Sequence, residues 1–232
     1  MTANETAHSE TLSFEEAVRA RRSVRRFRSE EIPQSLLRLV LEDAQQAPSN
    51  CNTQPWQSHV VSGAARDRLS AALLADWDAA RLTPDFSFDS NLYYGEYGAR
   101  RNHQAATYYE ALGISRDAYD DRRAASRANL SFFGAPHAAF LFLPSIGDNV
   151  RVASDVGMYA QTFLLALAAR GLAGVPQTML GYFAQTVRRE LGISDELKLL
   201  FGMSFGYADE ESGASRYRIG RASIDESVTF HS

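Results

Sequence analysis

The sequence has a single cysteine, Cys51, and no apolar run that approaches the ~20 residues of a membrane-spanning helix. One cysteine excludes an intramolecular disulfide framework and a zinc site built on several thiolates, and it fits a reducing compartment. The polar start of the chain lacks the basic residues and apolar core of a signal peptide, which predicts a short disordered leader over residues 1–12. We therefore expect a cytoplasmic protein without a membrane segment.

An excess of positive charge is also lacking. The chain has 24 Lys and Arg against 28 Asp and Glu, a formal net charge of -4. This balance gives no overall field that would hold a polyanion, so neither nucleic acid nor a membrane surface is expected as a partner. Paired carboxylates, a cluster of metal ligands and a nucleophile beside a base are missing as well, and no Gly-x-Gly-x-x-Gly segment predicts a separate Rossmann domain. No metal is expected.

Hydrophobic periodicity predicts many helices and few strands. Helices are expected over residues 13–22, 33–47, 64–80, 99–112, 116–129 and 154–170, with another ending at Gly192, and strands over residues 57–62, 138–143 and 199–207. No repeat or linker divides the chain, which predicts a single domain over residues 13–232 with an extended C-terminal tail. Since the strands lie far apart in sequence, the expected fold class is α+β, with helices around a small mixed, mainly antiparallel sheet.

An arginine-rich segment, residues 19–27, carries the first chemical signal. Five arginines stand at a helix end and in the loop after it. Like charges this close repel one another, and an anion among them would relieve the repulsion. The forked guanidinium suits phosphate, and the hydroxyl of Ser23 adds a donor. A basic helix end surrounded by water explains this pattern equally well when it is taken alone.

Three further segments have polar or glycine-rich patterns. Residues 48–56 form a loop rich in amide side chains between two prolines, which suits a heterocycle with donor and acceptor edges, or an ordinary turn before a core tryptophan. Residues 171–179 predict a glycine-rich turn after a buried helix, with backbone N–H groups directed at a ligand. Residues 216–226 add arginines in a tail that is otherwise expected to be solvated.

Taken together with residues 202–207 and Arg221, these segments resemble the FMN-dependent nitroreductase family in order and spacing along almost the whole chain. The long insert at about 84–132 and residues 129–136 are similar to the nitrobenzoate reductase-like members. The resemblance implies a nitroreductase-like fold and an intertwined homodimer with FMN at the subunit interface. It also implies a variable insert that caps the flavin.

The activity implied by the resemblance is an NAD(P)H oxidoreductase. NADPH or NADH would donate electrons, and a nitroaromatic or similarly electron-poor small molecule would accept them in a ping-pong, two-electron reaction. The chemistry would be carried by the flavin N5, so no side chain is expected to be catalytic. An FMN-dependent dehydrogenase, dehalogenase or enone reductase is an alternative, as is a flavin-binding protein without turnover.

The same resemblance implies roles for the arginines. Arg21, Ser23 and Arg221 would hold the FMN phosphate, and Arg22 would contact phosphate or ribityl oxygens through its side chain or backbone. Arg25 would place a cation near the pyrimidine edge of the flavin, where the reduced ring carries negative charge.

The remaining cofactor and substrate positions come from the loops and the insert. Asp155 would lie near the ribityl chain, with a helix-capping acid as the alternative. Three tyrosines of the insert would stack on an aromatic acceptor, or belong to an ordinary secondary core. They are Tyr93, Tyr94 and Tyr97. The partner subunit would supply Pro48, Ser49, Asn50 and Asn52, while Pro176, Gln177 and Thr178 would line the site, with the backbone N–H groups of Gln177 and Thr178 directed at N5 and O4.

Overall fold

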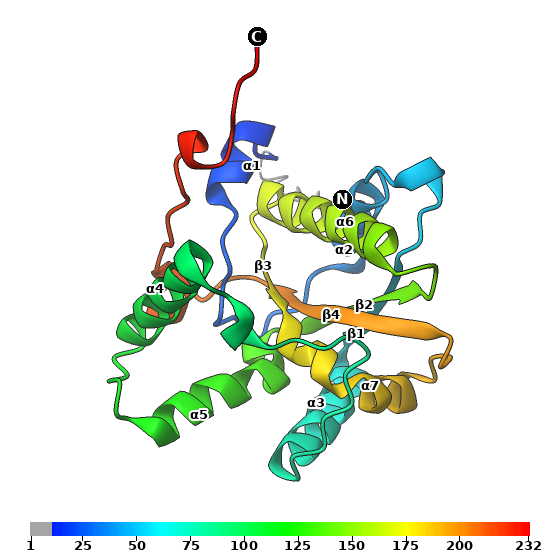
Figure 1. Ribbon diagram of the computed structural model, residues 1–232. Helices are drawn as coiled ribbons and strands as arrows, with labels where there is room; N and C mark the ends of the chain where they lie inside the picture. Colours follow the sequence, from blue (N-terminus) through cyan, green and yellow to red (C-terminus); the bar gives the residue numbers. More distant parts are fainter. Residues whose placement is uncertain (1–10) are drawn as a thin grey trace, which may run out of the picture.

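The computed structural model describes residues 11–232, so most of the predicted disordered leader lies outside the described residues (Figure 1). The helices are α1 (Phe14–Ala20), α2 (Gln34–Ala44), α3 (Gly63–Asp78), α4 (Gly95–Ala111), α5 (Tyr119–Arg127), α6 (Val150–Ala169), α7 (Ala184–Leu191) and the short α8 (Gly213–Arg216). The strands are β1 (Gln57–Ser62), β2 (His137–Pro144), β3 (Ala173–Gln177) and β4 (Leu197–Gly206). These elements confirm the predicted α+β class.

The four strands form one sheet in the order β1-β2-β4-β3, and each neighbouring pair is antiparallel. Within residues 11–232, parallel pairing occurs only at an isolated bridge between Ser23 and Gly174. Strand β2 is central and buried at every position except its last. Its side chains alternate between two hydrophobic clusters on opposite faces, because successive residues of a strand point to opposite sides.

Helices cover both faces of this sheet (Figure 1). The apolar faces of α2 and α6 pack on one side, and α3 and α7 pack on the other. Helix α6 is long and apolar enough to cross a membrane by length and composition alone, but 56% of its apolar window is buried inside the fold, as in the core helix of a globular protein. The insert helices α4 and α5 contribute no buried residue. These two helices are thus poor in core residues, as their composition predicts, whereas Leu130 and Phe132 at the end of the insert are fully buried.

The predicted turn over residues 171–179 is wrong in one respect, because most of it is strand β3, paired with β4. The glycines of this segment are typical of a turn, but glycine at position 174 is required by packing. A Cβ at this position would lie 2.9 Å from a methyl group of Leu164 and 3.1 Å from one of Leu167. Glycine is therefore required for α6 to lie this close to the strand, not for a reversal of the chain.

Two other predicted boundaries differ. Helix α1 ends at Ala20 rather than at Arg22, because Arg21 turns to φ -57° and ψ 124° and Ser23 then pairs with Gly174. The tail is not wholly extended, since one helical turn over Ile224–Glu226 is closed by a capping box. Leu12, placed at the end of the predicted leader, donates its N–H to the carbonyl of Ala169 at 2.8 Å.

A buried histidine makes the core sensitive to acid. His137 is 4% exposed, and its Nε2 accepts the N–H of Ile32 at 2.9 Å. Its ring stacks on Phe205 with centroids 5.4 Å apart, and its Nδ1 has no partner among the described residues. Burial lowers the pKa of His137 below its usual value, and Glu31 opposes this effect only in part.

Protonation of His137 is therefore expected to destabilise the fold. The stability that neutral His137 provides is complete above the pKa of this group in the unfolded chain, about 6.5. It is lost as the pH falls through the lower pKa of His137 in the folded protein. The free energy of unfolding should decline over this range by up to about 1.4 kcal/mol per pH unit. His137→Gln keeps an acceptor for the N–H of Ile32 but does not titrate. The free energy of unfolding, measured with urea at pH 5–7, should therefore depend less steeply on pH in this variant. The exposed His103→Gln is the control, and equal slopes in all three proteins would contradict this assignment.

Candidate functional site

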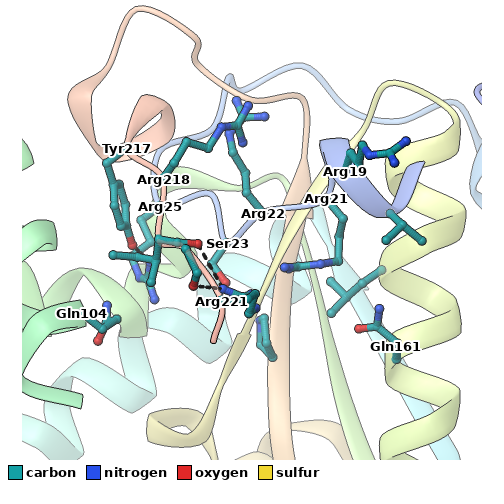
Figure 2. Close-up of a pocket in the computed structure, with 15 residues that line it drawn as sticks. Arg19, Arg21, Arg22, Ser23, Arg25, Gln104, Gln161, Tyr217, Arg218 and Arg221 are labelled. Atoms are coloured by element: carbon teal, nitrogen blue, oxygen red, sulfur yellow. Dashed lines mark hydrogen bonds between the residues drawn. The ribbon is translucent and has the colours of Figure 1, made fainter. Parts of the chain in front are cut away.

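A cavity of about 700 Å³ opens where the N-terminal arginine segment meets the C-terminal tail (Figure 2). Segments far apart in sequence meet there: the end of α1 with its following loop, α4, α6, β3 and the tail. The lining residues are Val18, Arg19, Arg21, Arg22, Ser23, Arg25, Gln104, Gln161, Leu164, Pro176, Tyr217, Arg218, Ile219, Gly220 and Arg221.

Backbone hydrogen bonds fix the arginine segment beside the sheet. The capping box of Ser13 and Glu16 starts α1, which directs the chain toward the cavity. After the helix, Arg28 donates its N–H to the carbonyl of Tyr207 at 2.9 Å, and the carbonyl of Arg26 accepts from Asp209 at 3.0 Å. The loop therefore runs along the end of β4 and has a defined course rather than that of a solvated helix end.

The cavity holds positive charge that no acidic side chain neutralises. Arg19 is paired with Glu15, and Arg22 with Glu210 at 2.5 Å. Four other guanidinium groups of the lining have no carboxylate within 4.0 Å in the described part of the chain. These four are Arg21, Arg25, Arg218 and Arg221.

Arg21 shows the cost of this arrangement most clearly. Burial, and then the positive charge of Arg221, lower the pKa of Arg21 below its ordinary value. The nearest hydrogen-bond acceptors for Arg221 are the carbonyls of Ile219 at 3.1 Å and Gly220 at 3.0 Å. An anion between the two guanidinium groups would relieve their repulsion.

The donor set fits a cofactor that carries phosphate. Guanidinium forks and the hydroxyl of Ser23 bind phosphate oxygens well. The amides of Gln104 and Gln161 can both donate and accept, and Leu164 adds an apolar surface. The cavity therefore offers groups for the phosphate, polar chain and ring of a flavin mononucleotide.

Arg22 is placed differently from Arg21. Its Nε donates to the carbonyl of Ser215 at 2.7 Å, and its Nη2 lies 2.5 Å from both carboxylate oxygens of Glu210. The side chain thus fastens the tail to the arginine segment. A cofactor contact through the side chain is disfavoured by this geometry, and the contact through the Arg22 backbone stays a prediction.

The amide-rich loop lies apart from this cavity. Asn50 donates its N–H to both carboxylate oxygens of Asp155, at 3.1 and 3.2 Å, and Gln54 donates its N–H to the Ser49 hydroxyl at 2.9 Å. Asp155 is 3% exposed and thus caps this loop rather than its own helix. Three residues near the loop's centre have positive φ: Cys51, Asn52 and Gln54. None of Pro48, Ser49, Asn50, Asn52 and Asp155 lines the cavity of its own chain.

The end of β3 reaches the cavity through Pro176. The side chain of Gln177 points into the core, where its Nε2 donates to the carbonyl of Asn129 at 3.0 Å and its Oε1 accepts from the hydroxyl of Ser204. Thr178 is exposed. Since the Gln177 side chain is fully engaged, a ligand would meet the backbone at this point, and the predicted N–H roles remain predictions.

The three tyrosines predicted at the substrate position gather at the start of α4. They are exposed, and the rings of Tyr94 and Tyr97 meet edge to face with centroids 6.0 Å apart. Tyr93 contacts Phe88 in a similar way at 6.1 Å. Exposure at these positions does not favour an ordinary secondary core, but the tyrosines do not line the cavity of their own chain.

Sequence reasoning missed several lining residues. Gln161 is a polar position on the mostly apolar face of α6, and this contrast could have indicated a ligand. Tyr217 lies between two arginines of the tail, which was a further signal. The sequence around Gln104 contains no such signal, because the position of Gln104 in the cavity depends on how the insert packs.

Fold and cavity together define a class of α+β proteins with an arginine-lined site for a phosphorylated cofactor. The Nitroreductase family model matches residues 18–207. The chain is 46% identical to nitroreductase NfnB of Mycolicibacterium smegmatis over 93% of this chain and 92% of the relative. It is 34% identical to a 4-nitrobenzoate reductase of Nocardioides sp. over 94% and 90% of the two chains.

Solved structures agree with these relatives. The FMN-dependent nitroreductase NfnB from Mycobacterium smegmatis, crystallised in complex with NADPH, superimposes with a TM-score of 0.90. It has 45% sequence identity, with 94% of this chain and 97% of that chain covered. The chain belongs to the nitroreductase family, which confirms the resemblance and the predicted fold.

Inorganic phosphate is expected to stabilise the protein free of cofactor through the unpaired arginines. At ten times its Kd, a bound anion adds about 1.4 kcal/mol of stability, which raises Tm by roughly 3–6 °C for a chain of this size. Arg21→Gln should abolish most of this gain and leave the phosphate-free Tm unchanged or slightly higher, because repulsion is relieved. Arg19→Gln, which removes a guanidinium already paired with Glu15, is the matched control. An equal gain in all three proteins, by differential scanning fluorimetry, would place the anion elsewhere.

Proposed function

We propose that this protein is an FMN-dependent NAD(P)H oxidoreductase that reduces nitroaromatic or similarly electron-poor small molecules. The observation that carries the proposal is the convergence of Arg21, Arg25 and Arg221 on one cavity without carboxylate partners. Support also comes from relatives, because one is named for 4-nitrobenzoate reduction and another was crystallised as an FMN-dependent enzyme with NADPH. These activities are those of the relatives, and they agree with the chemistry of the cavity.

In this proposal, residues of the chain bind FMN, orient its ring and favour its reduced form. Arg21 and Arg221 would hold the phosphate with the hydroxyl of Ser23, and their unneutralised charge favours an anionic cofactor. Arg25 would present a cation to the pyrimidine edge of the ring, where a fixed positive charge favours the reduced cofactor. When bound, FMN supplies two-electron chemistry between NAD(P)H and the organic acceptor.

Other residues complete the site around the ring. Backbone N–H groups of Gln177 and Thr178 would direct donors at the edge of the flavin, and the rigid attachment of Gln177 to Asn129 and Ser204 keeps this backbone in place. The exposed Tyr93, Tyr94 and Tyr97 would form the surface on which an aromatic acceptor stacks. No side chain is assigned a proton-transfer or nucleophilic role.

The direct test is the visible spectrum of the purified protein under anaerobic conditions. We expect flavin bands from a cofactor released as FMN, bleaching with NADPH or NADH, and recovery of the bands with 4-nitrobenzoate. A colourless protein that cannot be reconstituted with FMN would defeat the proposal. Bleaching without recovery by a nitroaromatic would favour a related FMN reaction, such as enone reduction, and bound flavin that NAD(P)H does not bleach would indicate binding without turnover.

We also propose that two copies associate, so that the loop over residues 48–52 of one subunit completes the cavity of the other. Apolar side chains are exposed along α1, α6 and the tail, including Phe14 at 76%, Met158 at 37% and Phe230 at 83%. The tail, which projects beyond the rest of the chain in Figure 1, carries the last of these. Surfaces of this kind usually contact a partner. The cytoplasmic location remains a prediction.

A dimer has a mass twice that of the 25.7 kDa chain, which light scattering on a sizing column measures directly. Met158→Glu places a charge on the exposed face of α6 and is expected to shift the protein toward monomer and to weaken FMN binding by at least tenfold. Leu82→Glu changes an equally apolar side chain, 53% exposed, after α3, and should leave both properties unchanged. A wild-type monomer that binds FMN normally would contradict the assignment.

A further inference from the structure

Arg25 is held by aromatic rings rather than by a carboxylate. Its guanidinium carbon lies 4.9 Å from the ring centroid of Tyr108 and 5.8 Å from that of Tyr217. Its Nη1 donates to the hydroxyl of Tyr217, and the two rings lie 5.6 Å apart at 44°. These two tyrosines come from different places, since Tyr108 belongs to α4 in the insert and Tyr217 to the tail.

This arrangement fixes a cation without cancelling its charge. A carboxylate beside Arg25 would neutralise the field that the guanidinium projects into the cavity. Aromatic faces attract a cation through their quadrupole and carry no net charge, so the guanidinium is oriented while its field remains. Burial raises the pKa of Tyr108 to about 12, so its ring stays a neutral phenol at physiological pH.

We propose that Tyr108 and Tyr217 are positioning residues that hold the Arg25 guanidinium at the wall of the cavity and thereby raise the reduction potential of bound FMN. The inference rests on the proposed function. A fixed cation stabilises the extra negative charge of the reduced cofactor more than a mobile one, because it needs no reorganisation when that charge develops. Through Tyr108, the insert therefore influences the electronics of the site as well as its shape.

The test is the midpoint potential of the FMN-loaded protein and its variants, measured by spectroelectrochemistry. Arg25→Gln should lower the potential most. Tyr108→Leu should weaken the preference for reduced over oxidised FMN about tenfold, which equals about 30 mV for two electrons. Tyr217→Phe, which removes the hydroxyl but keeps the ring, should lower the potential by less.

Matched variants separate positioning from general damage to the insert. Tyr119→Leu changes a tyrosine of the insert at the start of α5 that is 78% exposed, and should leave the potential unchanged. Tyr108→Phe keeps the aromatic face and should restore the wild-type value. In an Arg25→Gln background, Tyr108→Leu should add no further shift, because the group that it positions has gone.

Several results would overturn the inference. One is an unchanged potential in Tyr108→Leu while Arg25→Gln shifts it, and another is an equal shift in Tyr119→Leu. If Tyr108→Leu does not fold by circular dichroism, the decision passes to Tyr217→Phe, whose potential must fall. A wild-type protein that takes up no FMN overturns the proposed function and this inference together, whereas FMN uptake with no shift in Arg25→Gln overturns this inference alone.

Discussion

The repulsion among unneutralised guanidinium groups is the constraint on which the rest of the site depends. Burial, and then the nearby positive charge of Arg221, lower the pKa of Arg21, and no carboxylate in the described part of the chain separates the two guanidinium groups. A fold keeps such groups together only if other contacts outweigh the repulsion. Here these contacts are backbone hydrogen bonds along β4 and the attachment of the tail by Arg22 to Glu210 and Ser215. Arg22 thus has a structural role, whereas the neighbouring Arg21 is available to a ligand.

The close approach of α6 and β3 decides where the cavity lies. Because Gly174 has no side chain, Leu164 and Leu167 pack directly against the strand. Leu164 also lines the cavity, with Gln161 one turn earlier on the same helix and Pro176 two residues beyond Gly174 on the strand. The arginine segment is joined to this corner by the bridge between Ser23 and Gly174. One glycine therefore brings the core helix, the sheet edge and the charged loop together.

The sequence predicted elements with a clear local period and failed where tertiary packing decides. The predicted bounds of β1 agree with the structure, and α6 is recognisable from its apolar composition. The sequence of residues 171–179 predicts a turn because glycine has the same signature in a turn and under a packed helix. The arginine segment and Arg221 were predicted to share a phosphate site, and the cavity does bring them together. The placement of Arg22, Gln104 and Tyr108 was not predictable, since it depends on how the tail and the insert pack.

Arginine, rather than lysine, suits each position of this site for a physical reason. Lys198 is the only lysine in the chain, and it lies outside the cavity. A planar guanidinium stacks on tyrosine rings, is weakly hydrated and stays charged when partly buried, whereas a lysine ammonium is strongly hydrated and loses its proton more readily on burial. At Arg25 all three properties are needed at once, because the group is half-buried, lies against two rings and has no anion beside it. The aromatic insert and the arginine segment therefore act together on the electrostatic potential of the cavity, and we expect a change in either to alter the potential at a bound cofactor.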